Sequence, residues 1–469
     1  MNPKTLSRAR LLPALLLLAG PLGAHPHFSP AQMLKRVREI DTILALKPPA
    51  DPKKKALLLE EQAQMLFPLG RLEEGVAAME KALELQPKDA TLFYNFASLL
   101  LTRDLVREAL PYLRKSAALE PKEPRYQTLL AQALERAALW EEAARAWLQA
   151  AALEKDPSLK AEKLGSAAHC MEKAGKEKEA EKLLDQAVAA AEKSPIWYHQ
   201  RALFFLRTGR PARAAADLAR AVEVAGDDEG EVYAWLVEEG EAWKKAGREA
   251  RAARAFRAAL KEIARILQED TAFAEDFYFH QARAYLGLGD PKQAAQALKK
   301  ALEILPGEPP YLELGLRVFQ AAGLSGDLER TREALAAERD KERRALEEDA
   351  LDRDRRIRKA RLQLDRARRL TAAWRALAQR KGVEQALAEL EKTGRAGRVL
   401  AARVKALWAL EKGDPQGALQ ALQVLPGRLR AHEAWAAAVR LQAFRALGKA
   451  EEAAKAKALL ESYLTSAGV

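Results

Sequence analysis

One spacing of small, apolar and helix-stopping residues recurs along this chain at intervals of about 34 residues. It is clearest in residues 289–306 (GDPKQAAQALKKALEILP), where a glycine is followed at fixed distances by alanine, leucine, alanine and proline. The same frame returns in residues 70–87 and, with Asp104 in place of the glycine, in residues 104–121. Glycine allows a tight turn before a helix, and a proline ends the helix that precedes it. The pattern therefore predicts repeated pairs of short helices.

The helix that precedes each frame also repeats. It carries a large apolar residue, a small residue four positions later and another large apolar residue three positions after that. The matching triplets are Phe93-Ala97-Leu100, Leu164-Ala168-Met171, Tyr198-Ala202-Phe205, Leu236-Gly240-Trp243 and Tyr278-Ala282-Tyr285. We expect the small residues to lie where the two helices of a unit approach closely. The two patterns place units at residues 56–89, 90–123, 124–157, 161–194, 195–228, 233–266 and 275–308, with a degenerate further unit from Pro309.

The composition favours a purely helical chain. The strong helix formers Ala, Leu, Glu, Lys and Arg dominate the 469 residues, and only 25 Gly and 22 Pro interrupt them. Alternating Val, Ile and Thr stretches bounded by turn residues, which would indicate strands, are almost absent. Because the chain is too long for one compact core, we expect an all-α repeat array.

Together the two patterns resemble the tetratricopeptide repeat family, whose unit is a pair of antiparallel helices. The resemblance implies a right-handed α-solenoid of helix–turn–helix repeats in which the first helix of each unit lines a concave groove. It also implies a non-catalytic scaffold or adaptor that holds an extended peptide or a partner helix in that groove.

Mapped onto the local pattern, the resemblance predicts groove-facing residues that are mostly polar or basic. They are Tyr94, Ser98, Arg125, Gln132, Arg136, His169, Lys173, His199, Arg207, Glu241, Lys245 and Arg283. Arg136, Lys173, Arg207 and Lys245 would form a basic ladder, which favours acidic segments or a terminal carboxylate. A lysine near this place is ordinary in the family, and only Asn95 fits the pattern of members that clamp two carboxylates. We therefore predict a general peptide- or protein-binding groove.

The first 24 residues have the build of a secretory signal peptide. Lys4, Arg8 and Arg10 precede an apolar run from Leu11 to Ala19, and a small-residue cleavage site ends at Ala24. We expect cleavage there, with an uncleaved interfacial anchor as the alternative. The mature chain would then be exported, to the periplasm or alternatively to the extracellular space. No later run is long and apolar enough to predict a transmembrane span.

The remaining chain divides by pattern. Residues 25–54 are predicted to hold an N-terminal capping helix, with Ser29 as its N-cap and Pro30 as its first residue. Residues 55–326 form the repeat array, and residues 382–469 form degenerate C-terminal helical repeats, clearest in 405–426 and 441–464. The single cysteine, Cys170, lies among alanines in a helical pattern and is predicted to be buried and unreactive.

Residues 327–381 form a long charged helix by pattern, or a hairpin that breaks near residues 347–354. The charge of this segment is polarised: residues 329–352 hold nine acidic and six basic residues, and residues 353–369 hold nine basic and two acidic. A weak, coiled-coil-like heptad seam runs through it, with Ala and polar residues at several positions. Its members are Leu346, Ala350, Ile357, Ala360, Leu364, Ala367 and Trp374.

This segment has two interpretations. One is a solvated spacer helix stabilised by ion pairs between neighbouring turns. The other is a basic patch that binds anionic cell-wall polymer, polysaccharide or lipid headgroups. The patch consists of Arg353, Arg355, Arg356, Arg358, Lys359, Arg361, Arg366, Arg368 and Arg369. Nucleic acid is not expected, because an exported protein rarely meets it.

Motifs that carry chemistry are missing from the sequence. It has no phosphate-binding glycine loop, nucleophile elbow or paired-cysteine metal site. The segment His432–Ala436 (HEAWA) begins like a zinc-protease helix but has Ala436 where the second histidine is required. A copper site at His25 and His27 of the mature chain is the alternative to incidental histidines. We predict no catalytic residue, metal or cofactor, and a protein or peptide partner in the cell envelope.

Overall fold

The computed structural model describes residues 28–46, 48–226, 231–269, 274–425 and 434–467. The predicted signal peptide, His25, His27 and His432 lie outside these residues. The described residues are all-α and form no strand, which confirms the predicted fold class. None of the described helices has the length and apolarity needed to cross a membrane.

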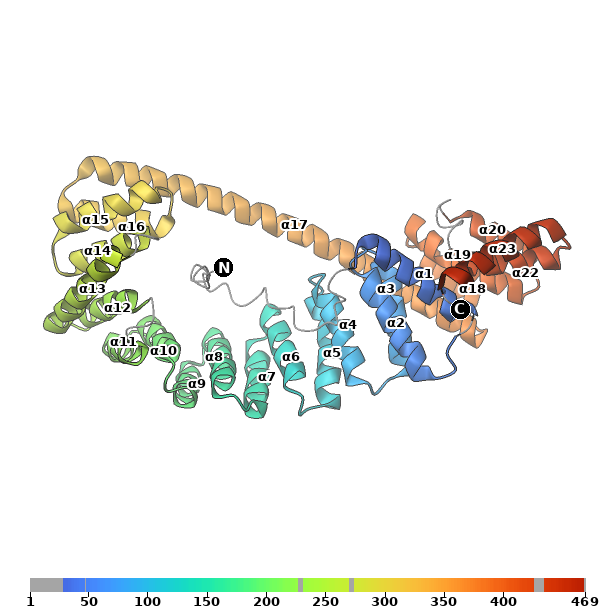
Figure 1. Cartoon of the computed structure of the whole chain (residues 1–469), viewed down its shortest axis with the longest axis horizontal. Coiled ribbons are helices and arrows are strands. Elements are labelled where there is room, and N and C mark those ends of the chain that lie inside the picture. The colour runs from blue at the N-terminus through green and yellow to red at the C-terminus, as the bar shows by residue number, and fades with distance from the viewer. Residues whose placement is uncertain (1–27, 47, 227–230, 270–273, 426–433, 468–469) are drawn as a thin grey trace. The chain divides into compact units, whose positions relative to one another are not determined.

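Consecutive helices pack in pairs, as in an α-solenoid (Figure 1). In each pair the second helix follows the first after a short turn. The pairs are α2 (Pro52–Leu66) with α3 (Leu72–Leu85), α4 (Ala90–Leu101) with α5 (Val106–Leu119), α6 (Pro124–Arg136) with α7 (Trp140–Leu153), α8 (Pro157–Lys173) with α9 (Glu177–Ala190), α10 (Pro195–Arg207) with α11 (Pro211–Ala225), α12 (Val232–Lys245) with α13 (Glu249–Glu269), and α14 (Ala274–Gly287) with α15 (Pro291–Ile304). The degenerate unit begins with α16 (Pro309–Ala322).

Small residues lie at the close approaches within the pairs, as predicted. Ala97, Ala168, Ala202 and Ala282 are all buried. At the corresponding place in α12, a Cβ built on Gly240 would lie 2.5 Å from the ring of Phe256, a residue of α13. Close packing of this kind leaves no room for an added methyl group, so the small residue is required by the neighbouring aromatic ring.

The turn inside each pair needs a left-handed backbone. Gly289 adopts it with φ of +80°, and Asp104 and Ala138 adopt it with φ of +59° and +56°. Asp tolerates this conformation better than Ala does, and Gly adopts it without steric cost. The glycine position of the repeated pattern therefore reflects the need for a left-handed backbone at the turn, and two repeats adopt this conformation without glycine.

The described residues group into two compact units. Unit 1 comprises the chain up to Pro121 and from Arg355 onward, and unit 2 comprises Lys122–Asp354. Unit 2 is therefore an insertion in the sequence of unit 1. The predicted boundaries of the capping helix, the repeat array, the charged helix and the C-terminal repeats stay predictions.

Unit 1 joins N-terminal and C-terminal helices. Helix α1 (Pro30–Leu46) contacts α2 and also α22 and α23. Its predicted cap at Ser29 is confirmed, because Gln32 N donates to Ser29 Oγ (3.3 Å) and Ser29 N donates to Gln32 Oε1 (2.7 Å). The C-terminal helices are α18 (Val383–Glu391), α19 (Arg395–Glu411), α20 (Pro415–Gln423), α22 (Ala434–Ala446) and α23 (Ala450–Ala467). One apolar core of the unit combines Ala77 of α3 with Leu370, Val383 and Leu390.

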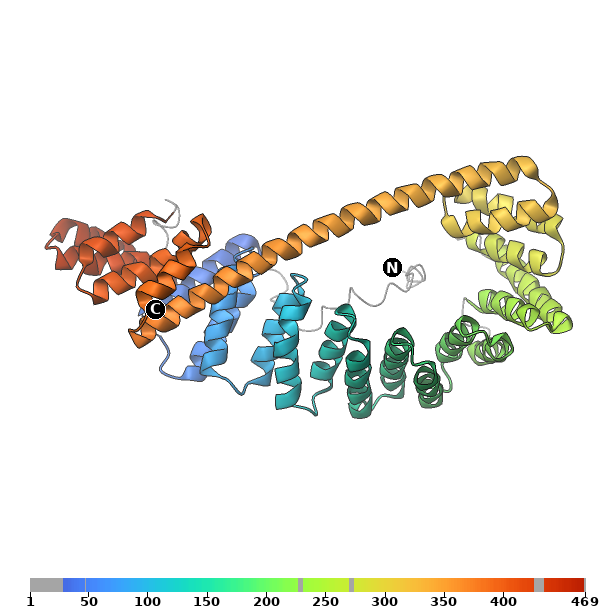
Figure 2. The ribbon, with the colours of Figure 1, turned by 180° about the vertical axis from the view of Figure 1, so that it is seen from behind.

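The charged segment is one continuous helix, α17 (Ser325–Gln379), and not a hairpin (Figure 2). The solvent exposure of its heptad seam decreases along the helix. Leu346 is 64% exposed, whereas Ala360, Leu364 and Ala367 are buried, with Leu364 only 4% exposed. Of the other seam residues that follow Arg355, Ile357 is half-buried and Trp374 packs against the apolar core of unit 1.

Candidate binding surfaces

The first helices of unit 2 form the surface that the sequence predicts as a groove. We call the solvent-facing sides of α6, α8, α10, α12 and α14 the first-helix surface. Contacts join α8 to α10, and α12 to α14, so the first helices of these repeats are neighbours. Side chains on these helices can therefore interact across repeats, and one ligand can contact side chains of several repeats at once.

Polar contacts connect each of these helices to the next, and we call them the inter-repeat ladder. From α6 to α14 they are Cys170 Sγ to Glu135 (2.9 Å), Arg207 to Glu172 (2.7 and 2.8 Å), His199 Nε2 with Glu238 (2.8 Å), Tyr233 Oη to Asp276 (2.5 Å) and Arg283 to Glu241 (2.9 and 3.1 Å). Five carboxylates thus lie among the side chains that the sequence predicts as a basic groove.

The α12–α14 part of the ladder includes the buried side chains of Tyr233 and His280. Arg283 lies 3.1 Å from His280 Nδ1, and burial together with the Arg283 charge holds the pKa of His280 well below its usual value. Burial raises the pKa of Tyr233, and the neighbouring Asp276 acts in the same direction. His280 is therefore neutral and Tyr233 keeps its proton at physiological pH, so this part of the surface presents fixed hydrogen bonds and aromatic rings.

Cys170 belongs to the ladder but not to its exposed face. It is fully buried, as predicted, and burial together with the Glu135 hydrogen bond raises the pKa of its thiol. Because the thiolate is the reactive form, this cysteine is unreactive.

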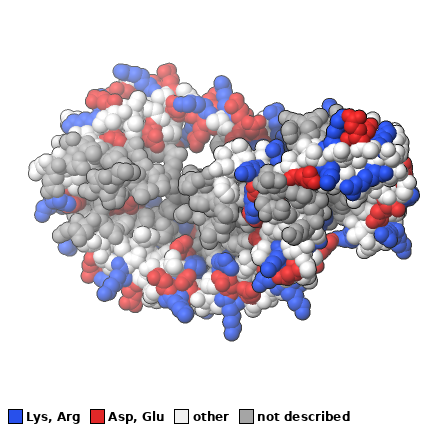
Figure 3. All heavy atoms as spheres, turned by 45° about the vertical axis from the view of Figure 1, so that its right-hand side comes forward, with Lys and Arg blue, Asp and Glu red and all other residues white. Residues whose placement is uncertain are grey.

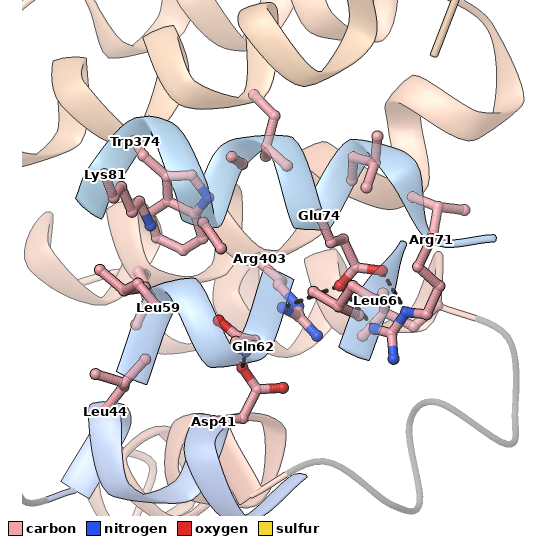
Figure 4. Close-up of a pocket in the computed structure, with 17 residues that line it drawn as sticks. Asp41, Leu44, Leu59, Gln62, Leu66, Arg71, Glu74, Lys81, Trp374 and Arg403 are labelled. Atoms are coloured by element: carbon pink, nitrogen blue, oxygen red, sulfur yellow. Dashed lines mark hydrogen bonds and ion pairs between the residues drawn. The ribbon is translucent and has the colours of Figure 1, made fainter. Parts of the chain in front are cut away.

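A cavity of about 330 Å³ lies in unit 1, between α1, α2, α3, α17 and α19 (Figure 4). Leucine is the most frequent residue of its walls. At one end, Arg71 donates to Glu74 (2.6 Å), and Arg403 lies 3.5 Å from the same carboxylate. At the other end, the Lys81 ammonium lies 4.3 Å from the centre of the Trp374 ring.

The charges of the cavity affect one another. Burial alone would raise the pKa of Glu74, but the guanidinium groups of Arg403 and Arg71 outweigh it and lower that pKa. Burial lowers the pKa of Lys81 to about 8, with the Arg403 charge as a further cause in the same direction. The cavity thus combines an ionised carboxylate with an ammonium group that lies close to its titration range.

Comparison with known proteins identifies the repeats. The family model described as tetratricopeptide repeat matches residues 66–133, and a second model with the same description matches residues 275–307. The two matches cover α3 to α6 and the α14–α15 pair. This chain is a tetratricopeptide repeat protein. Repeats of this family form protein-interaction scaffolds, so proteins are the expected class of partner.

Solved structures resemble this tetratricopeptide repeat protein only weakly. The pilF protein of Pseudomonas aeruginosa is 15% identical at a TM-score of 0.33, with 58% of this chain and 99% of that chain covered. A tetratricopeptide repeat protein from Parabacteroides merdae is 16% identical at a TM-score of 0.33, with coverages of 57% and 99%. The Cut9–Hcn1 assembly of the APC/C is 18% identical at 0.32, with coverages of 62% and 54%. Superpositions this poor carry no argument about function. The comparison with curated proteins found no match.

The predicted groove residues of this tetratricopeptide repeat protein differ in accessibility. Tyr94 and Ser98 lie on α4 in unit 1, where Ser98 is buried and donates to the Tyr94 carbonyl (2.9 Å). The others lie in unit 2. Exposed among them are Arg125, His169, Lys173, Arg207 and Lys245, and half-buried are Gln132, Arg136, His199, Glu241 and Arg283. Their assignment to a ligand-binding groove stays a prediction.

The predicted basic ladder is partly compensated. Arg207 is paired with Glu172, whereas Lys173 and Lys245 have no ion pair within the part of the chain that the structure describes. Sequence reasoning missed the carboxylates Glu135, Glu172, Glu238 and Asp276 as members of this surface. The signal that could have found them is the separation of acid and partner by roughly one repeat.

The predicted basic patch is also largely paired inside the protein. Arg361 donates to Glu108 of α5 (2.8 Å), Arg366 donates to Glu73 of α3 (2.7 Å), and Arg369 contacts both Asp365 and Glu389. Arg353, Arg355 and Arg358 have partners as well. Burial raises the pKa of Glu80 and of Tyr112 on neighbouring helices, and the charge of Arg368 opposes this rise in part. Arg356 and Lys359 are exposed and form no ion pair among the described residues.

Acidic and basic side chains are interspersed on the face of the molecule seen in Figure 3. The described residues contain no group of three or more His, Cys, Asp or Glu side chains that could hold a metal ion. Most of the charged side chains described above are thus paired, and a few exposed basic side chains such as Lys173, Lys245 and Lys359 form no ion pair among the described residues.

Proposed function

We propose that this tetratricopeptide repeat protein is an exported, non-catalytic scaffold that binds a protein segment along the first-helix surface of unit 2. The repeat architecture supports a protein-interaction scaffold in general. The particular surface is supported by the inter-repeat ladder, which aligns polar side chains of consecutive first helices.

The observation that carries the proposal is the partly exposed ion pair of Arg207 and Glu172. Their side chains are 52% and 22% exposed, and exposed ion pairs contribute only about 0–1 kcal/mol to stability. A carboxylate of a partner can therefore replace Glu172 on Arg207 at little cost. Lys173 lies on the same surface and adds a second cation.

An apolar contact is available beside this pair. Ile196 is 53% exposed and, with His199 and Arg207, falls at helical spacing on one side of α10. The surface therefore fits a segment that combines acidic side chains with an apolar residue, in extended or helical form.

The cell envelope is the proposed location, because the first 24 residues have the composition of a secretory signal. Fractionation of cells that express the full chain tests this part, together with mass spectrometry of the N-terminal peptide. Retention of the protein in the cytoplasm with an intact N-terminus would contradict it.

In-cell photo-crosslinking tests the binding surface. A photoreactive residue is placed at Lys173 or Lys245, with Lys178 on the second helix α9 as the matched exposed control. We expect a protein crosslink from the first two positions and not from Lys178, and we expect Arg207→Glu to weaken it.

A third labelled position, Lys359, tests the alternative that the basic patch binds anionic cell-wall polymer, polysaccharide or lipid headgroups. Crosslinks confined to Lys359, or association with wall or membrane material that salt removes, would overturn the scaffold proposal in favour of this alternative.

A further inference from the structure

The cavity in unit 1 holds a cation without a matching anion. Lys81 lies on α3, and its ammonium faces the Trp374 ring rather than a carboxylate. It has no ion pair or hydrogen bond among the described residues. Buried charges in proteins are normally paired, because an unpaired charge loses its hydration without compensation. The indole face compensates in part through a cation–π interaction.

The other charges of the cavity are already balanced against one another. Glu74 lies within ion-pair distance of both Arg71 and Arg403, and Asp41 accepts a hydrogen bond from Gln62 (2.7 Å). The lining thus contains three cationic side chains and two carboxylates. One positive charge is in excess, and Lys81 is the group that carries it.

The remaining lining is apolar. Leu44 comes from α1, Leu59 and Leu66 from α2, Leu370 from α17, and Leu400 and Leu407 from α19. The volume of about 330 Å³ is at the lower end of the range of small-molecule sites. A leucine-lined space of this size with one excess cation is complementary to a small amphipathic anion.

We infer that this cavity binds a small ligand with an apolar body and a single carboxylate, which pairs with Lys81 while the body contacts the leucine walls. The ligand is a free aliphatic carboxylic acid or the C-terminal residue of a peptide, since both present this chemistry. A dianion such as a phosphate monoester fits less well, because Glu74 and Asp41 repel the second charge. This site belongs to unit 1 and the first-helix surface belongs to unit 2, so its test does not depend on the proposed scaffold function.

The ionisation of Lys81 supplies a pH dependence. The charged groups in its surroundings are Asp41 from α1, Lys55 from α2, Glu74 and Glu84 from α3, and Arg403 from α19, while α17 contributes the uncharged Trp374 ring that the ammonium contacts. Burial lowers the pKa of Lys81 to about 8. Because the carboxylate binds the charged ammonium, affinity falls as the pH rises through that pKa, and it also falls in acid, where the carboxylate of the ligand becomes protonated.

Calorimetric titration of the full chain with octanoate tests the inference. We expect octanoate to bind, and Lys81→Met to weaken binding about tenfold or more, since a hydrogen bond to a charged group contributes this much. Lys88→Met, at an exposed position just after α3, is the matched control and leaves affinity unchanged. The uncharged analogue 1-octanol should bind weakly and equally to wild type and Lys81→Met.

Further measurements distinguish a free carboxylic acid from a peptide C-terminus and control for misfolding of the variants. Tighter binding of N-acetyl-Ala-Leu than of octanoate, with loss on C-terminal amidation, identifies a peptide terminus, and the reverse order identifies a free acid. Lys81→Arg keeps the charge and should keep binding, and binding of 1-octanol by Lys81→Met at the wild-type level shows that this variant is folded. The inference is overturned if neither carboxylate binds wild type, or if Lys81→Met binds both as tightly as wild type does.

Discussion

The two units stabilise themselves with the same types of side chain but over different distances along the chain. In unit 2, Arg207 and Arg283 reach carboxylates that are 35 and 42 residues away, which is about one repeat. In unit 1, Arg361 and Arg366 reach carboxylates that are 253 and 293 residues away. Unit 2 is thus built from contacts between neighbouring repeats. Unit 1 is complete only when the residues from Arg355 onward pack against the N-terminal helices.

The strongest test of this comparison removes apolar packing that the C-terminal part of unit 1, after Arg355, makes with its N-terminal part. Leu370→Ala deletes a side chain that is 4% exposed and packs in the core with Ala77 and Val383. We expect unit 1 to lose about 2–5 kcal/mol of unfolding free energy, while unit 2 is unchanged. Hydrogen exchange read by mass spectrometry, peptide by peptide, separates the two units.

Leu346→Ala on the same helix is the control for this experiment. Leu346 is 64% exposed, so its truncation should change stability by less than about 0.5 kcal/mol. Equal effects of the two substitutions, or faster exchange in unit 2 for Leu370→Ala, would show that the units are not separately stabilised.

A second prediction disturbs packing between neighbours in unit 2. Gly240→Ala places a methyl group 2.5 Å from the Phe256 ring, and we expect a loss of about 1–3 kcal/mol that spares unit 1. Chemical unfolding followed by circular dichroism measures it. Adding Phe256→Leu should recover part of the loss, and a double variant that is less stable than the sum of both changes would exclude the steric explanation.

A third prediction compares one ion pair from each unit. Arg366→Gln removes a pair whose side chains are 19% and 13% exposed, and we expect a loss of about 1–3 kcal/mol from unit 1. Arg207→Gln removes a pair that is 52% and 22% exposed and should cost less than about 1 kcal/mol. Unfolding at low and high salt measures both. A larger effect at Arg207 would reverse the comparison.

The smallest expected effect concerns the turns, which the units share. Ala138 adopts φ of +56° at an exposed position, so Ala138→Gly should stabilise unit 2 by about 0.5–1 kcal/mol. The converse change Gly289→Ala, where an added Cβ meets nothing within 4 Å, should destabilise by a similar amount. Thermal unfolding measures both, and a shift of the same sign in the two variants would exclude backbone strain as the cause.

The repeats of both units could be predicted because their causes are local. The close approach at Ala97 or Gly240 and the left-handed turn at Gly289 each restrict a residue within a single pair of helices, and the sequence records that restriction directly. The N-cap at Ser29 was predictable for the same reason. Sequence reasoning left the choice between a helix and a hairpin open at residues 347–354, because a charged heptad seam is compatible with both.

The candidate surfaces were harder to predict, because the acidic residues that neutralise their arginines lie far away in the sequence. Sequence reasoning found Arg207 but not its partner Glu172, which looks like any solvated acid until the repeats are stacked. It offered a basic patch that includes Arg361 and Arg366 as one of two interpretations, since nothing local indicates that Glu108 and Glu73 meet these arginines. The cavity around Lys81 was not foreseen at all, because its walls come from five helices spread over both ends of the chain.

The insertion of unit 2 within unit 1 also sets an order of assembly. A ribosome delivers the chain from its N-terminus, so α2 to α5 emerge long before the residues after Arg355 that complete their unit. Residues 122–354 are contiguous and can form all their own contacts as soon as they have been synthesised. The contacts of Glu73 with Arg366 and of Ala77 with Leu370 can therefore form only after more than two hundred intervening residues have been synthesised.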